Sequence, residues 1–323
     1  MENLKTQTRA RRLALGRALR PGSVPVGVLS AAFLVLWCTG YPAARIALDH
    51  AAPFTIITLR FGIAGLIYAA LAQAAGVWPR GRELLHSAVV GATSLALQFG
   101  CVYFAAARGV SLGLIALVTG IMPIVTALFA RLLGEPVRAR QWVGFACGFG
   151  GVALAVGEGI HLDVSAGLGA YLAVLVSLLA ISAGTVYQKR FASSVDVRSG
   201  LALQHAVATV LLLPLALHEG LRADGSAALR TALGWLILVN SVGGFALFFL
   251  LLRRGAVNQV AALFFLMPPV TALLDYLVLG EPLSVLQAGG IALAALGVFL
   301  ATRPARLSAP PAATPRSCRA PCE

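Results

Sequence analysis

Two ionisable side chains lie inside long apolar segments, and they are the first candidates for chemistry. Arg60 lies about seven residues into the segment 53–75, and Asp275 lies about four residues before the end of 257–279. A charge inside a membrane is costly, so such a side chain faces the interior of a helix bundle and usually has a partner. Both residues are expected in the same half of the membrane. We therefore hypothesise that they face one cavity, in direct contact or joined by a substrate. The alternative for Asp275 is a carboxylate that reaches water at the membrane surface.

Polar and aromatic side chains also interrupt the apolar segments. A buried amide in lipid needs a hydrogen-bonding partner, so these groups are expected to line a wet cavity or to contact another helix. Gln98 and Asn240 are favoured as lining residues, because the tyrosines of this group lie near helix ends, where they also suit anchoring at the membrane surface. The candidates for a substrate cavity are Trp37, Arg60, Gln98, Gln188, Asn240, Ser241 and Asp275.

Prolines inside apolar segments are candidates for gating, and they are Pro123, Pro268 and Pro269. Each removes a backbone donor and kinks its helix, which exposes carbonyl groups that need other partners. The kink is either static or a hinge beside the cavity. The recurrence of these prolines at matching places in two halves of the chain favours the hinge.

Two short motifs combine glycine, glutamate and proline, and we interpret both as turns. Glycine fits the position after a helix ends, and proline suits the first turn of the next helix. An acid beside a helix N-terminus is favourable for the helix dipole. The motifs are Gly134-Glu135-Pro136 and Gly280-Glu281-Pro282.

One serine motif suggests a different chemistry. Gly109-Val-Ser111-Leu-Gly113 matches the G-x-S-x-G pattern of serine hydrolases, with His205 or His86 as a base. That pattern requires a strand–turn–helix elbow, whereas here it joins two apolar segments, and Ser111 more simply caps the following helix. His205 could carry protons near neutral pH or pack as a hydrogen-bonded core residue. An intramembrane serine hydrolase is an alternative to transport, and so is a passive solute channel.

The elements that position these residues are transmembrane helices. The chain has 323 residues, of which 59% are hydrophobic and 11% are charged, whereas soluble domains have about a quarter charged residues. Ten apolar segments are each near the roughly 20 residues that cross a bilayer as a helix. Their ranges are 24–45, 53–75, 84–106, 111–131, 139–157, 166–187, 199–217, 231–252, 257–279 and 285–302.

The distribution of Lys and Arg predicts the orientation. The net charge is +13, and with a cytoplasmic N-terminus the cytoplasmic segments carry 20 basic residues against four on the other side. Basic residues concentrate in cytoplasmic loops, so both termini are expected in the cytoplasm. This basic balance therefore indicates membrane orientation and not nucleic-acid binding.

An internal repeat divides the chain into two five-helix halves. Met122-Pro-Ile-Val-Thr-Ala-Leu128 recurs as Met267-Pro-Pro-Val-Thr-Ala-Leu273, and the spacing of 145–146 residues holds for other matches. Five helices is an odd number, so the second copy must be inverted, as in many secondary transporters. We expect a basic cytoplasmic tail at 1–23, repeats at 24–157 and 166–302, and a disordered cytoplasmic tail at 303–323.

This pattern resembles the EamA family of the drug/metabolite transporter superfamily. The resemblance rests on two five-helix units, each with a proline in its fourth helix, a Gly-Glu-Pro turn and a glycine-rich fifth helix. Trp37, Pro53 and Arg60 also match the family in the first unit. The resemblance implies an all-α membrane protein of ten helices around a central cavity, and export of small metabolites such as amino acids, toxic analogues or drugs.

The resulting prediction is a non-enzymatic secondary transporter in the inner membrane. No phosphate-binding loop or metal-binding pattern occurs in the sequence, so we expect no cofactor and no metal. The expected partners are a small-molecule substrate and the lipid bilayer, with no nucleic acid. Gly144, Gly148 and Gly151 in one segment and Gly289 and Gly290 in another predict close helix packing, or a homodimer contact.

Overall fold

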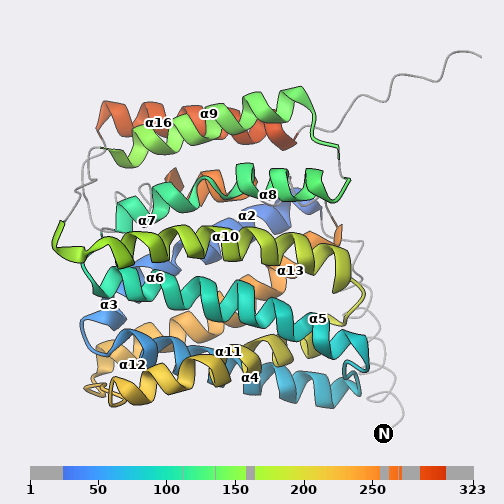
Figure 1. Ribbon diagram of the computed structural model, residues 1–323, viewed down its shortest axis with the longest axis vertical. Helices are drawn as coiled ribbons and strands as arrows, with labels where there is room; N and C mark the ends of the chain where they lie inside the picture. The colour runs from blue at the N-terminus through green and yellow to red at the C-terminus, as the bar shows by residue number, and fades with distance from the viewer. Residues whose placement is uncertain are drawn as a thin grey trace, which may run out of the picture.

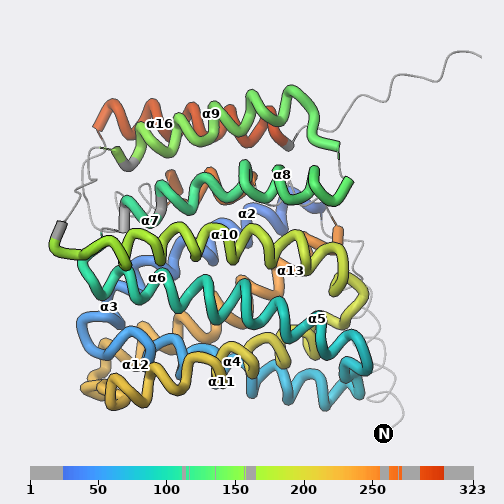
Figure 2. Tube along the Cα trace, in the orientation of Figure 1, coloured from blue at the N-terminus to red at the C-terminus, as the bar shows by residue number. Residues whose placement is uncertain are grey.

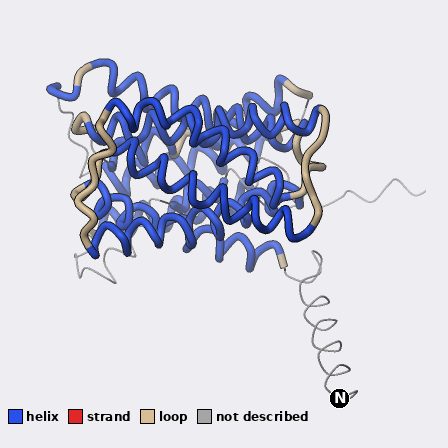
Figure 3. The backbone as a smooth tube through the Cα atoms, turned by 90° about the horizontal axis from the view of Figure 1, so that it is seen from below, coloured by secondary structure: helices blue, strands red, loops and turns tan. Residues whose placement is uncertain are grey.

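The computed structural model describes residues 25–110, 112–134, 136–157, 164–254, 262–267, 269–270 and 284–302. Within these residues the chain is a helical bundle whose long helices lie side by side (Figure 1). The connecting loops gather at the two ends of the bundle (Figure 3). We call the end that carries residues 49–52, 108–110 and 219–226 the Arg45 end. The end that carries residues 76–81 and 192–196 is the Arg190 end.

In the described residues the first repeat contains three membrane-length stretches, the α7–α8 stretch and the glycine-rich α9. Several stretches are interrupted, so one crossing consists of two or three consecutive elements. These are α2 (Val26–Cys38) with α3 (Gly40–Leu48), α4 (Pro53–Ala75), α5 (Arg82–Val90) with the π-helix η1 (Gly91–Leu97) and α6 (Gln98–Ala107), α7 (Leu112–Thr119) with α8 (Met122–Leu132), and α9 (Ala139–Val156).

The second repeat follows the same order of elements. After the 3₁₀ turn η3 (Val164–Ala166) come α10 (Leu168–Phe191), α11 (Val197–His218), α12 (Ala227–Trp235) with the π-helix η4 (Leu236–Gly244) and α13 (Phe245–Arg254), the 3₁₀ helix η5 (Leu263–Leu266), and α16 (Val285–Thr302).

The predicted segments agree with the described helices to within a few residues. Within the described ranges, six helices are long and apolar enough to cross a membrane: Val26–Leu48, Pro53–Ala75, Arg82–Ala107, Leu168–Phe191, Val197–His218 and Ala227–Arg254. The shorter apolar helices Leu117–Leu132 and Val285–Ala301 coincide with further predicted segments. The predicted segment 257–279 lies mostly outside the described residues.

Matched helices of the two repeats pack against each other in opposite directions. In the α4–α11 pair, the nearest neighbour of Gly62 is Thr209 and that of Gly65 is His205, so numbering rises along one helix as it falls along the other. The α9–α16 pair is also antiparallel and lies at one edge of the bundle (Figure 2). Inverted repeats are related by a two-fold axis that lies in the membrane plane, and such an axis makes matched helices run antiparallel. The packing therefore agrees with the inverted repeat predicted from the sequence.

The two π-helical stretches also obey the repeat. η1 begins at Gly91 and η4 begins at Leu236, which are 145 residues apart, the spacing of the sequence repeat. Such π segments occur frequently at functional sites. Here they lie in the matching third helices, directly before Gln98 and around Asn240.

Two loops at the Arg45 end are joined across the repeats. Ala51 and Ala223 form an isolated antiparallel bridge, flanked by hydrogen bonds from the Ala52 N–H to the Arg222 carbonyl (2.9 Å) and from the Asp224 N–H to the His50 carbonyl (3.0 Å). His50 Nδ1 lies 2.6 Å from Asp224 Oδ2. A hydrogen bond from the Ser226 N–H, together with His50, holds the pKa of Asp224 below its usual range. The α3–α4 loop is therefore attached to the α11–α12 loop.

We expect the double variant Ala51→Cys, Ala223→Cys to form a disulfide on mild oxidation. Directly opposed residues of an antiparallel bridge have Cα atoms about 4.5–5.5 Å apart, within the range that a disulfide spans. Mass spectrometry of a digest would identify the linked peptides. The control is Ala52→Cys with Ala223→Cys, because successive side chains of an extended strand point to opposite faces. Equal cross-linking in both variants would contradict the bridge.

Candidate functional site

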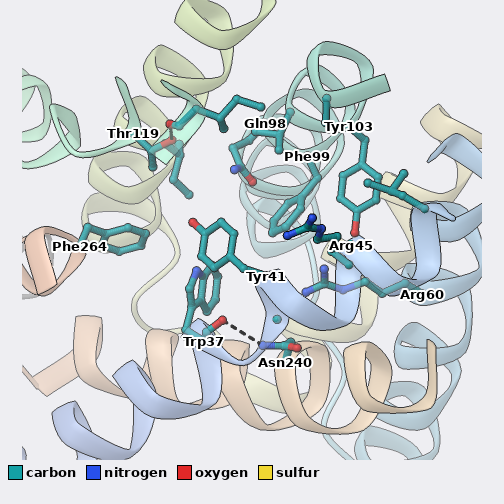
Figure 4. Close-up of a pocket in the computed structure, with 17 residues that line it drawn as sticks. Trp37, Tyr41, Arg45, Arg60, Gln98, Phe99, Tyr103, Thr119, Asn240 and Phe264 are labelled. Carbon is teal, nitrogen blue, oxygen red and sulfur yellow. Dashed lines mark hydrogen bonds between the residues drawn. The ribbon is translucent and has the colours of Figure 1, made fainter. Parts of the chain in front are cut away.

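One cavity lies between α3, α4, α6 and α7 and opens towards the Arg45 end (Figure 4). Its direction follows from its lining, because Arg45 and Leu48 lie near the end of α3 and Ala106 near the end of α6. Both halves of the chain contribute side chains. The lining residues are Trp37, Gly40, Tyr41, Ala44, Arg45, Leu48, Arg60, Gln98, Phe99, Val102, Tyr103, Ala106, Ile115, Thr119, Ile181, Asn240 and Phe264.

The first transmembrane helix is broken beside this cavity. Pro42 has no N–H for the Cys38 carbonyl, to which residue 42 of an unbroken helix would donate, and its ring crowds that carbonyl. The chain accordingly leaves α2 at Cys38, makes a turn at Thr39 and begins α3 at Gly40. The crossing predicted at 24–45 is described as the span Val26–Leu48, with this one-residue interruption inside it. A short helix, α3, forms one wall of the cavity.

Asn240 from η4 caps the broken helix. Its Nδ2 donates to the Leu36 carbonyl at 2.6 Å and to the Trp37 carbonyl at 3.3 Å (Figure 4). Thr39 Oγ1 also donates to the Leu36 carbonyl, and it accepts a bond from Trp235 Nε1 at 3.0 Å. A Cβ at Gly40 would lie 2.7 Å from Asn240 Nδ2, so only glycine admits the amide. The amide of one repeat thereby satisfies carbonyl groups that the break exposes in the other.

Arg60 of α4 also lines the cavity and forms a hydrogen bond to the second repeat. The side chain is only 5% exposed, and its Nε donates to Ser241 Oγ at 2.7 Å. Its guanidinium carbon lies 5.0 Å from the centre of the Phe99 ring and 5.6 Å from that of Phe61. The Tyr103 side chain is near enough to interact with it electrostatically. Within the described part of the chain, no carboxylate forms an ion pair with Arg60.

Aromatic side chains close the cavity towards the Arg190 end. Trp37 packs on Phe245 at a ring distance of 5.1 Å, and both Trp37 and Phe33 pack on Phe248 and Phe264 at 5.7–6.2 Å. All but Trp37 are almost fully buried. These rings come from α2, α13 and η5, so the closed side is an aromatic contact between the two repeats.

The remaining candidates from the sequence lie in several places. Trp37, Arg60, Gln98 and Asn240 line the cavity, and Ser241 lies behind it as the partner of Arg60. Gln188 lies towards the Arg190 end, where its Oε1 accepts a bond from Gln204 Nε2 at 3.1 Å. Asp275 lies outside the described residues, so the hypothesis that it pairs with Arg60 stays a prediction.

The predicted gating and turn residues are described in part. Pro123 is the second residue of α8, directly after the interruption that separates α7 from α8. Pro269 is buried in a helical stretch, and Pro268 lies outside the described residues. Gly134 has a left-handed φ of 88° just after α8, a conformation that glycine adopts without strain, and Pro136 follows in an exposed turn. Glu135, Gly280, Glu281 and Pro282 lie outside the described residues.

The two histidines considered as bases for the serine motif have other partners in the described residues. Gly109 follows α6 at the Arg45 end, whereas His86 lies in the first turns of α5 near the opposite end and approaches Tyr187 Oη at 2.9 Å. His205 is fully buried among Phe61, Tyr68 and Phe245, with Nδ1 2.9 Å from the Leu201 carbonyl. Ser111 itself lies outside the described residues. Among the residues described, no cluster of three metal-ligating side chains occurs.

The family can be decided by comparison with known proteins. The sequence pattern of the EamA-like transporter family matches residues 25–157 and again residues 168–303. The chain belongs to this family.

Relatives of this EamA-like transporter agree with that assignment. It is 27% identical to YedA of Escherichia coli K12, described as an uncharacterized inner membrane transporter, over 84% of this chain and 88% of the relative. It is 28% identical to the uncharacterized transporter YvbV of Bacillus subtilis, over 84% and 90% of the two chains. It is also 28% identical to a Streptantibioticus cattleyicolor protein named probable terminal-alkyne amino-acid exporter, over 84% and 91%.

A solved crystal structure shows the same fold. It superposes with a TM-score of 0.73 over 86% of this chain and 96% of the other, at 22% identity. Together, the family, the relatives and the membrane-length helices identify a multi-pass transporter of the inner membrane.

Several residues that line the cavity of this EamA-like transporter escape sequence reasoning. Arg45 counts as a loop charge in the sequence, yet it lines the cavity. Phe99, Thr119 and Phe264 are indistinguishable in the sequence from ordinary apolar or small residues of a helix. Pro42 carried a usable signal, because a proline inside a helical pattern marks a kink or an end.

Proposed function

We propose that this EamA-like transporter exports small organic solutes as a secondary transporter that works by alternating access. The observation that carries the proposal is the cavity itself, which side chains of both repeats line and which aromatic rings from both repeats close on one side. Rocking of one repeat against the other would open the aromatic side and close the Arg45 side, as inverted repeats allow.

The direction of the open cavity follows from the charge distribution. The excess of Lys and Arg in the loops of the Arg190 end and in both terminal tails assigns that end to the cytoplasm. The cavity would then face the outside, and the aromatic contact would form the cytoplasmic gate. Export of an amino-acid-like solute is supported by the relative named as a probable amino-acid exporter.

The proposal is tested by counterflow in proteoliposomes with a panel of amino acids, nucleosides and toxic analogues, chosen from a resistance screen in cells. A carrier accumulates labelled solute when unlabelled solute is loaded on the other side, whereas a channel does not. We expect counterflow for at least one solute class. The alternating-access proposal is wrong if solutes cross only down their own gradient.

A cavity variant extends this test. We expect Gln98→Leu to reduce counterflow at least tenfold, because it removes a buried polar group from the cavity wall. The matched control is Gln73→Leu, since Gln73 is an exposed residue at the end of α4. Equal losses in the two variants, at equal amounts of folded protein, would place the transport path elsewhere.

A further inference from the structure

Arg60 presents a charge that its surroundings do not balance. It is 95% buried, and the one hydrogen bond it donates goes to the neutral hydroxyl of Ser241 through Nε. A guanidinium has five N–H donors in a planar fork. The neutral Tyr103 hydroxyl can take one of those on the terminal nitrogens, so the others are left for another acceptor. The rings of Phe99 and Phe61 favour a cation over their faces, but they do not neutralise it.

A buried cation of this kind requires an anion. Removing a charge from water costs several kcal/mol even after the protein relaxes, unless a counter-charge is present. Within the described residues no carboxylate forms an ion pair with Arg60. Arg45 adds a second basic residue at the mouth of the same cavity. The described lining therefore includes two cationic side chains and no acidic one.

The cavity contains further unused polar atoms. Gln98 Oε1 and Asn240 Oδ1 are buried and have no hydrogen-bond partner among the described residues. The orientation of the Asn240 amide is fixed, because its Nδ2 donates to two carbonyl groups of α2. These acceptors suit a donor group of a polar solute, such as an ammonium or a hydroxyl, whereas the donors of Arg60 suit a carboxylate, which can only accept.

We propose that Arg60 binds the carboxylate of the transported solute and so selects organic carboxylates over the corresponding amines. This inference rests on the proposed transport function and names its substrate class. The planar fork matches a carboxylate with two parallel hydrogen bonds, and the neighbouring Trp37, Phe99 and Phe264 surround an apolar substituent. Arg60 Nε keeps its hydrogen bond to Ser241 Oγ, so the terminal nitrogens of the guanidinium are the ones that bind the solute.

The first test compares solutes that differ in one group. Labelled phenylalanine and leucine are offered in counterflow against their decarboxylated amines, their amides and their phosphonic acid analogues. We expect the carboxylates to compete and the amines and amides not to compete. Competition by the phosphonates as well would agree with selection of an anionic group over the amine, because a guanidinium fork also binds other oxyanions. Transport of amines alone would overturn the inference while the transport function stands, and no counterflow by any solute class would overturn the proposed function itself.

The second test uses variants of Arg60 in the purified full-length protein. Arg60→Lys keeps the charge but loses the fork, so half-maximal counterflow of a carboxylate should need at least tenfold more solute. Arg60→Met should abolish carboxylate transport, yet raise the midpoint of thermal unfolding because an unbalanced buried charge is removed. The inference is wrong if Arg60→Met lowers the midpoint and Asp275→Asn lowers it equally. That result would show that Asp275 is the internal counter-charge of Arg60.

Discussion

Replacing Gly297 by alanine is expected to destabilise the transporter strongly, whereas the same change at Gly289 should stabilise it slightly. A Cβ at Gly297 would lie 2.3 Å from the Gly148 nitrogen and 2.6 Å from the Gly144 carbonyl oxygen. Both are backbone atoms, which cannot rotate away as a side chain can, so α16 would have to move off α9. At Gly289 no atom lies within 4 Å of the added carbon.

The size of this effect follows from the way that the two helices pack. Inserting a methyl group into a closely packed contact costs about 1–3 kcal/mol, and occasionally more. The contact at Gly297 is helix backbone against helix backbone, so the upper part of that range is expected. At an exposed helix position, glycine to alanine is instead stabilising by about 1 kcal/mol. The two variants should therefore change the free energy of unfolding in opposite directions.

A second pair of variants tests the same contact from the other helix. A Cβ at Gly151 would lie 2.3 Å from the Ala294 nitrogen, while one at Gly150 would meet only a side-chain carbon of Leu293 at 3.7 Å. Thermal unfolding in detergent, followed by the loss of the monodisperse peak in size-exclusion chromatography, is a suitable measurement. If Gly151→Ala and Gly150→Ala unfold at the same temperature, α9 and α16 do not approach as closely as the structure shows.

These glycines also show what the sequence could and could not predict. Their spacing predicts a close helix contact, but a small-residue face looks the same whether its partner is within the chain or in a second copy. The structure shows that α9 and α16 use it within one chain. Gly297 faces this contact although it was not among the predicted glycines, and Gly289, which was among them, faces open space.

The helix boundaries were predictable for a simple physical reason. Lipid requires about 20 consecutive apolar residues per helix, so each crossing leaves a strong mark on the sequence. The antiparallel packing of matched helices was also predictable, since five predicted helices per repeat require an inverted second copy. What hydropathy does not record is the path of the backbone inside an apolar segment. The π segments η1 and η4 therefore appeared only in the structure, whereas the break at Thr39 has a sequence signal in Pro42 but none in hydropathy.

The sequence identified several residues of the candidate site, but it did not predict what each of them contacts. Arg60 and Asn240 stood out because polar groups are rare in apolar segments. Yet the sequence cannot distinguish an amide that touches a solute from one that caps a helix. Asn240 lines the cavity and also caps α2, because the two π-helical segments place the third helix of each repeat beside the cavity.

The cap at Asn240 leads to the largest expected effect on transport. We expect Asn240→Asp to reduce counterflow at least tenfold and to destabilise the protein. The amide nitrogen that donates to the Leu36 and Trp37 carbonyls becomes a carboxylate oxygen, which can only accept when ionised. The Leu36 carbonyl keeps Thr39 Oγ1 as a donor, so the lost bonds cost at most about 1–3 kcal/mol. A carboxylate facing two carbonyl oxygens adds repulsion. Asn240→Ala should lose the cap without that repulsion and be affected less.

Removing Pro42, which interrupts the helix between α2 and α3, tests whether Asn240 acts by capping that interruption. If Pro42 breaks the helix, Pro42→Ala should let α2 continue into α3 and make the cap unnecessary. The double variant Pro42→Ala, Asn240→Ala should then be more stable than Asn240→Ala alone, with a coupling within the range of about 0.5–3 kcal/mol seen for residues that share a network. It should still transport poorly, because α3 would no longer line the cavity as a separate helix. Additive losses of stability would show that Asn240 acts independently of the break, and normal transport by Pro42→Ala would show that the break is not required.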